Sequence, residues 1–129
     1  MSDYNDSLEV AAALSTAFET GDLEAIADLY ADDVVVWHNF DQLGRTREQA
    51  LSSAAWVAAE IEDFTVGDRW AAAVEGGYVQ QCVFRGRMRS SGEVLEMPSM
   101  LRVHVRDGQV TRIEEYADSG AGGNVPDPD

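Results

Sequence analysis

The stretch Gly21–Phe40, GDLEAIADLYADDVVVWHNF, changes from helical to strand periodicity within twenty residues. Asp22 can cap a helix, and the apolar residues that follow it recur three and four positions apart. The valine run after the two aspartates has a period of two instead, which places Val34, Val36 and His38 on one face of a strand. The stretch therefore predicts a short helix that leads into a strand, with an imidazole at the end of the valine face.

Helical patterns also lie on both sides of this stretch. Residues 6–20 carry apolar side chains at helical spacing, and Gly21 supplies the stop. Further along, Thr46 and Gln49 have the spacing of a capping box at the head of an alanine-rich segment that ends near Ile61. We expect three helices in the first half of the chain.

Strand patterns dominate the second half. Four runs of alternating apolar and polar residues, 64–74, 78–89, 94–105 and 110–118, are separated by the glycine-bearing turns EGG, SSGE and RDGQ. Helices first and hairpins afterwards predict an α+β domain with an antiparallel sheet curled around the helices. We expect one domain over residues 1–118 and a flexible tail over 119–129, which lacks large apolar residues.

Composition excludes several classes of protein. The chain has 129 residues, 24 acidic against 9 basic, and a formal charge of −15, which disfavours nucleic acids and anionic membranes as partners. No apolar run approaches the ~20 residues of a membrane helix, and the start of the chain has no secretory pattern. Cys82 is the only cysteine, so we expect a free thiol, a cytoplasmic location and no metal site.

The basic residues gather in the second half of the chain, where RGRMR contains Arg85 and Arg87, and Arg102 follows in the next strand. Two interpretations stay open for them. They can be exposed strand residues that balance acidic neighbours, or they can supply a cation to a binding site.

The order helix, helix, strand, helix and four-strand meander resembles the nuclear transport factor 2-like superfamily. The resemblance is carried by ETGDLEAIADLYADDVVVWHN, by the strand that contains Pro98 and by DGQVTRIEEYAD, and it covers about residues 6–118. Ketosteroid isomerases, SnoaL-like polyketide cyclases and limonene epoxide hydrolases belong to this superfamily. The resemblance implies a cone-shaped sheet that encloses an apolar pocket, a site without a cofactor and a homodimer formed through the outer face of the sheet.

The resemblance also implies two catalytic residues. His38 stands five positions after the second aspartate of the DD pair. The resemblance implies that the equivalent position in ketosteroid isomerases is the catalytic aspartate. Glu115 stands where epoxide hydrolases have a catalytic aspartate. The oxyanion-hole groups of the isomerases align with Leu14 and near Met100, neither of which is a comparable donor, and the second carboxylate of the hydrolases has no counterpart here.

A carboxylate inside an apolar cone needs a partner, and His38, Arg102 and Arg85 or Arg87 are the candidates for Glu115. Pairing with His38 would form an acid–base unit, in which Glu115 orients the imidazole that moves the proton. The predicted substrate-binding residues are Leu14, Tyr30, Val36, Arg85, Arg87, Met100, Arg102 and Ile113.

Two functions follow as hypotheses. In the first, the chain is a cofactor-free enzyme of isomerase, cyclase or hydrolase type that acts on a small apolar oxygenated molecule such as a polyketide, terpenoid or steroid-like compound. In the second, it is a non-catalytic module for ligand binding or dimerisation, and His38 and Glu115 only satisfy each other.

Overall fold

The computed structural model describes residues 3–118, with side chains from residue 6 onwards. Three helices are present in this part of the chain: α1 (Asp3–Thr20), α2 (Leu23–Leu29) and α3 (Arg47–Glu60). None of the described helices is long and apolar enough to cross a membrane. The strands are β1 (Tyr30–His38), β2 (Gly44–Arg45), β3 (Ile61–Val74), β4 (Gly77–Met88), β5 (Val94–Arg106) and β6 (Gln109–Ala117).

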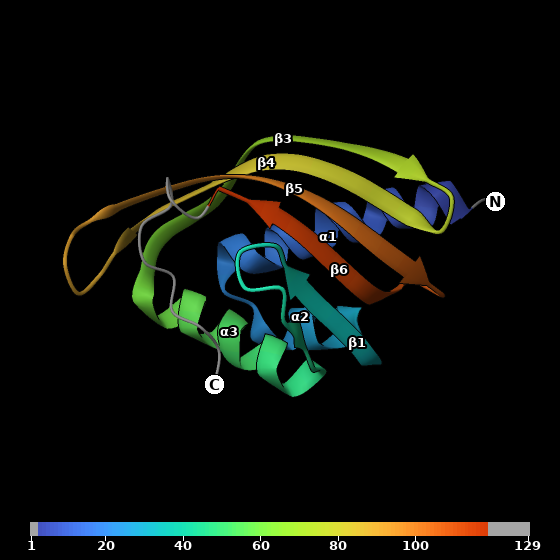
Figure 1. The fold of residues 1–129 in the computed structure, drawn as a ribbon, viewed down its shortest axis with the longest axis horizontal. Coiled ribbons are helices and arrows are strands. Elements are labelled where there is room, and N and C mark those ends of the chain that lie inside the picture. Colours follow the sequence, from blue (N-terminus) through green and yellow to red (C-terminus); the bar gives the residue numbers. More distant parts are fainter. Residues whose placement is uncertain (1–2, 119–129) are drawn as a thin grey trace.

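One six-stranded sheet has the order β2-β1-β6-β5-β4-β3. In Figure 1 the long strands β3 to β5 arch over α1, and all three helices lie on the same side of the curved, unclosed sheet. Irregular register in the β3–β4 pair, where Asp63 and Asp68 have positive φ, contributes to this curvature. The predicted α+β class, with a curved sheet around the helices, is confirmed.

The local signals identified in the sequence are present. Asp22 accepts a hydrogen bond from the Ala25 amide, and Thr46 and Gln49 form a complete capping box. The turn between β5 and β6 has positive φ at both Asp107 and Gly108, as a tight type I′ hairpin requires. The predicted tail, 119–129, lies outside the described residues.

Two features of β1 differ from the prediction. First, β1 pairs with β6 in parallel, so the sheet is not wholly antiparallel. A parallel neighbour needs no hairpin, and here α3 and the whole meander connect the two strands. Second, the loop after β1 returns as β2, which places Arg45 beside Val36. The two residues of β2 are too few to produce a strand pattern.

The core lies between the concave face of the sheet and the helices. It combines one face of α1 with the inward residues of β1, β4, β5 and β6. Val34 and Val36 are buried, as the strand pattern predicted, whereas Trp37 packs on the other face against Tyr116 with ring centroids 5.4 Å apart.

Candidate functional site

The parallel pairing of β1 and β6 places His38 directly opposite Glu115. The His38 Nε2 atom lies 3.1 Å from Glu115 Oε1, and the two side chains are 18% and 10% exposed. On the neighbouring strand β5, the Ser99 hydroxyl donates to Glu115 Oε2 over 3.4 Å. A carboxylate that is almost removed from water thus has a partner on each oxygen, as burial of a charge requires.

Asn39 holds the ends of β1 and β6 together around this pair. Its backbone amide donates to the backbone carbonyl of Glu115 over 2.9 Å, and its side-chain Oδ1 accepts from the backbone amide of Ala117, also over 2.9 Å. These two bonds bracket Glu115 in the strand, so the register of His38 against Glu115 is fixed by the residue that follows the histidine.

The loop between β1 and β2 brings a buried cation to the far side of the imidazole. The backbone amide of Gln42 donates to the carbonyl of His38, and the backbone amide of Leu43 donates to Asp41 Oδ1. These two bonds turn the chain back onto β1. Arg45 then lies 4% exposed. Its Nη1 is 2.8 Å from His38 Nδ1, and its Nη2 donates to Asp41 Oδ2.

Polar contacts therefore connect four side chains in series: Asp41, Arg45, His38 and Glu115. Partial burial opposes ionisation of Asp41, but hydrogen bonds from Arg45 and the Leu43 amide outweigh it and lower the pKa of that carboxyl. The exposed Phe40 ring stands beside the imidazole, with centroids 5.0 Å apart.

Other polar groups of the interior keep their protons at neutral pH. Burial raises the pKa of the Tyr30 hydroxyl, and the nearby Tyr78 and Glu115 add to the effect. Burial likewise raises the pKa of the Cys82 thiol to about 11, again with a contribution from Glu115. Among the described residues, the hydroxyls of Tyr30 and Tyr78 have no hydrogen-bond partner. Each is therefore a donor that a ligand could use.

The other predicted residues divide into two groups. Leu14, Tyr30, Val36 and Ile113 are buried in the core. The second group lies on the outer face of the sheet: Arg85, Arg87, Met100 and Arg102.

The outer arginines have partners of their own. Arg85 bonds to Asp68 and Glu96, which raises its pKa, and Arg87 donates to the carbonyl of Gly92. These contacts correct the expectation that an arginine of β4 or β5 reaches Glu115. The cation of the site comes from Arg45 instead.

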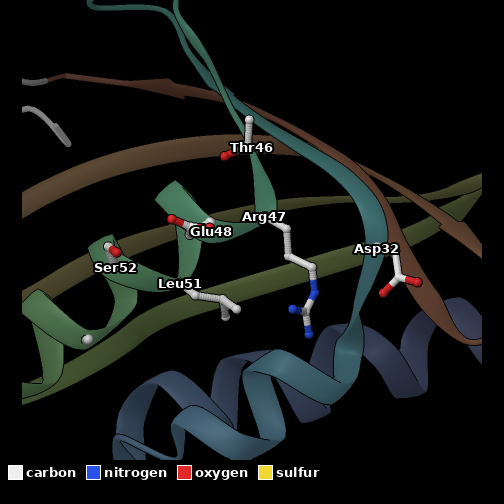
Figure 2. Close-up of a pocket in the computed structure, with 7 residues that line it drawn as sticks. Asp32, Thr46, Arg47, Glu48, Leu51 and Ser52 are labelled. Carbon is white, nitrogen blue, oxygen red and sulfur yellow. The ribbon is translucent and has the colours of Figure 1, made fainter.

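The two grooves described on the molecule lie elsewhere. The larger, about 810 Å³, opens between β1 and the start of α3 and is lined by Asp32, Thr46, Arg47, Glu48, Leu51, Ser52 and Ala55. Figure 2 shows Arg47 extending from α3 towards α2, opposite Asp32 on β1. The smaller groove lies along α1 and the start of α2. Neither groove includes His38 or Glu115.

Sequence reasoning missed Arg45 and Ser99. Arg45 stands in LGRT directly before a helix cap, where it resembles an ordinary loop cation, and only the return of β2 places it inside. Ser99 could have been found, because the alternation of β5 puts it on the face of Leu101 and Val103. Within residues 3–118, no group of three or more His, Cys, Asp or Glu residues is arranged to hold a metal ion.

Solved structures with the same fold include three relevant neighbours. IdmH from Streptomyces antibioticus, a proposed polyketide cyclase, has a TM-score of 0.78 at 24% identity over 90% of this chain and 94% of its own. A proposed polyketide cyclase from Xanthomonas campestris has a TM-score of 0.81 at 22% identity over 92% and 95%. An LEH-like epoxide hydrolase from M. tuberculosis has a TM-score of 0.79 at 14% identity over 94% and 89%.

At such identities these likenesses establish the fold alone. No curated protein matches the sequence significantly. The model of the SnoaL-like domain, however, matches residues 10–113, which is most of the chain. The protein therefore belongs to the SnoaL-like domain family.

Proposed function

We propose that the protein is a cofactor-free enzyme that uses the His38–Glu115 pair to move a proton to or from a small apolar oxygenated molecule. The observation that carries the proposal is the 3.1 Å contact between His38 Nε2 and Glu115 Oε1, made by two largely buried side chains. A paired carboxylate and imidazole at a partly accessible site is a common acid–base arrangement.

The surroundings of the pair support a substrate of this kind. Apolar side chains from α1, β1 and β6 dominate, namely Leu14, Val36 and Ile113. The hydroxyls of Tyr30 and Tyr78 are unpaired donors within the described residues, so each could bind a ketone, alcohol or epoxide oxygen of a ligand in this interior. The family and its neighbours, among them proposed polyketide cyclases, support the same class of molecule.

A ligand screen tests the proposal. Small apolar ketones, alcohols and epoxides are added singly, and the melting temperature is measured by differential scanning fluorimetry. A ligand of the native state at a hundred times its Kd should stabilise the fold by about 2.7 kcal/mol. Compounds that bind are then followed by mass spectrometry for isomerisation, cyclisation or hydration.

Variants connect turnover to the pair. His38→Ala and Glu115→Gln should each lose turnover by about 100-fold or more, because both remove a member of the acid–base unit. His104→Ala is the matched control, since His104 lies on the outer face and pairs with Glu114. Binding without turnover by any compound would favour the binding-module hypothesis instead.

We also propose that the protein forms a homodimer through the outer face of the sheet. Trp70, Met100 and Tyr116 are 55%, 43% and 55% exposed there. Cross-strand register through Gln81 aligns them in one row across β3, β4, β5 and β6. Aromatic residues and methionine are enriched in protein interfaces. The row is a surface that a second copy could cover.

A further inference from the structure

The guanidinium of Arg45 decides which nitrogen of His38 carries the proton. A guanidinium stays protonated and can only donate. Its Nη1 lies 2.8 Å from His38 Nδ1, so Nδ1 must present its lone pair. The single ring hydrogen of the imidazole then sits on Nε2, where it is donated to Glu115 Oε1 over 3.1 Å. Each of the two ring nitrogens then has a hydrogen-bond partner.

This arrangement leaves His38 without a free lone pair. To accept a proton at Nδ1, the ring would have to expel Arg45, which is 4% exposed and bonded to Asp41. The backbone of Arg45 is also held, because β2 pairs with β1 immediately before Thr46 caps α3. Movement of the guanidinium away from the ring would also break its hydrogen bond to Asp41.

Glu115 is in the opposite situation. Its Oε1 accepts one hydrogen bond from His38, and its Oε2 accepts one long bond of 3.4 Å from Ser99. The Ser99 hydroxyl lies within 3.3 Å of the Met97 carbonyl as well, so it can turn away from the carboxylate. A carboxylate oxygen has two lone-pair sites. Oε2 thus keeps one free for a proton from a ligand.

From these contacts we infer that Glu115 accepts the proton in the proposed reaction, and that Arg45 is a positioning residue that acts through His38 by fixing its Nε2–H tautomer. The inference rests on the proposed function and reverses the roles expected from the sequence, where His38 moved the proton. In the step, Glu115 Oε2 forms a bond to a hydrogen of the substrate or of water, the electrons of the broken bond stay on the substrate atom or the water oxygen, and the proton later returns from the same carboxyl group.

The hydrogen-bond assignment is tested without any substrate, by ¹⁵N NMR of the imidazole nitrogens at pH 7. The chain has two histidines, so the loss of signals in His38→Gln identifies those of His38. The wild-type spectrum should show an unprotonated Nδ1 and a protonated Nε2. A ring protonated on both nitrogens, or on Nδ1 alone, would overturn the assignment.

Two substitutions at position 45 sharpen this test. Arg45→Lys keeps a donor and should keep the wild-type pattern, whereas Arg45→Met should shift the Nδ1 resonance because that nitrogen loses its donor. Arg47→Met is the matched control. Arg47 lies two residues after Arg45, but its guanidinium donates to the Ala27 carbonyl and not to His38. An unchanged Nδ1 resonance in folded Arg45→Met would contradict the role of Arg45, and the wild-type spectrum still decides the tautomer if this variant does not fold.

Turnover separates the roles of the pair, with a compound that the wild type converts. The amide of His38→Gln can accept from Arg45 and donate to Glu115 but cannot carry a proton at neutral pH, so this variant should lose less turnover than Glu115→Gln. Glu115→Gln should lose about 100-fold or more. The reverse order of losses would overturn the inference. If no compound is converted, the proposed function and the catalytic role of Glu115 fail together, while the spectra judge the tautomer independently.

Discussion

The carboxylate of Asp41 is the counterion that allows Arg45 to be buried beside His38. Its side chain is 15% exposed, and its pKa is held below the ordinary value of 3.8 by Arg45 and the Leu43 amide. Asp41→Asn leaves the guanidinium with a weaker partner. We expect the free energy of unfolding at pH 7 to fall by about 1–3 kcal/mol, as measured by urea denaturation.

The same pair has a predictable pH dependence. Because the folded-state pKa of Asp41 is lowered, its stabilisation is complete above the ordinary pKa and is lost as the pH falls through the folded value. The gap in stability between wild type and Asp41→Asn should therefore begin to close as the pH falls towards the ordinary pKa, and it should continue to close below that value. Asp33→Asn, which removes an exposed charge, is the control. Parallel curves for wild type and Asp41→Asn would show that the ion pair contributes nothing.

Tyr30 tests the interior next to the pair. Its side chain is buried, and the nearby Glu115 contributes to the raised pKa of its hydroxyl. Tyr30→Phe should change the free energy of unfolding by no more than about 1 kcal/mol, because it keeps the buried ring and removes only the hydroxyl. The thermal shift produced by a bound ketone should shrink, since one hydrogen bond to the ligand is lost. Tyr116→Phe, on the outer face, is the control, and an equal shrinkage in both variants would place the ligand elsewhere.

At the scale of elements, the end of β1 depends on Asn39. Asn39→Ala removes the acceptor of the Ala117 amide, and the unpaired group should cost about 1–2 kcal/mol. Hydrogen exchange followed by NMR should show that the amide of Ala117 loses protection while that of Val103, in the centre of β5, keeps it. Asn39→Asp retains an acceptor oxygen of the same reach. Protection at Ala117 should survive in that variant, and its loss in both would mean that the side chain does not hold the strand.

What the sequence predicts about these elements depends on the range of the interactions. Helix caps and the Asp107–Gly108 turn are local, so their residues alone specify them. The parallel pairing of β1 and β6 joins segments about eighty residues apart, and no local pattern encodes it. For the same reason His38 and Glu115 were predictable only through a family resemblance.

The arginines also show which positions a local pattern can predict and which it cannot. In β4 the apolar residues Tyr78, Cys82 and Phe84 share one face, so the alternation itself places Arg85 and Arg87 on the other. Arg45 gave no such signal. Its burial depends on a two-residue strand and on Asp41, and a short loop sequence does not reveal either contact.

At the scale of the whole molecule, two opposing features bear on assembly. All three helices cover one face of the sheet (Figure 1). The exposed row of Trp70, Met100 and Tyr116 lies on the other face. An isologous dimer would place this row against its own copy. Each copy carries a formal charge of −15, which opposes association. The apolar contact and the charge repulsion respond differently to salt, and this difference can be measured.

The homodimer predicts a mass of about twice 14.1 kDa in size-exclusion chromatography with light scattering. Raising the salt concentration from about 0.05 M to about 0.5 M should tighten the dimer, because it screens the repulsion between the acidic copies. Trp70→Glu combined with Tyr116→Glu should produce monomers that keep the wild-type circular dichroism spectrum. Leu23→Glu, at an exposed apolar position on α2, is the matched control and should remain dimeric. A monomeric wild type at both salt concentrations, or dimers that survive the double substitution, would exclude the outer face of the sheet as the interface.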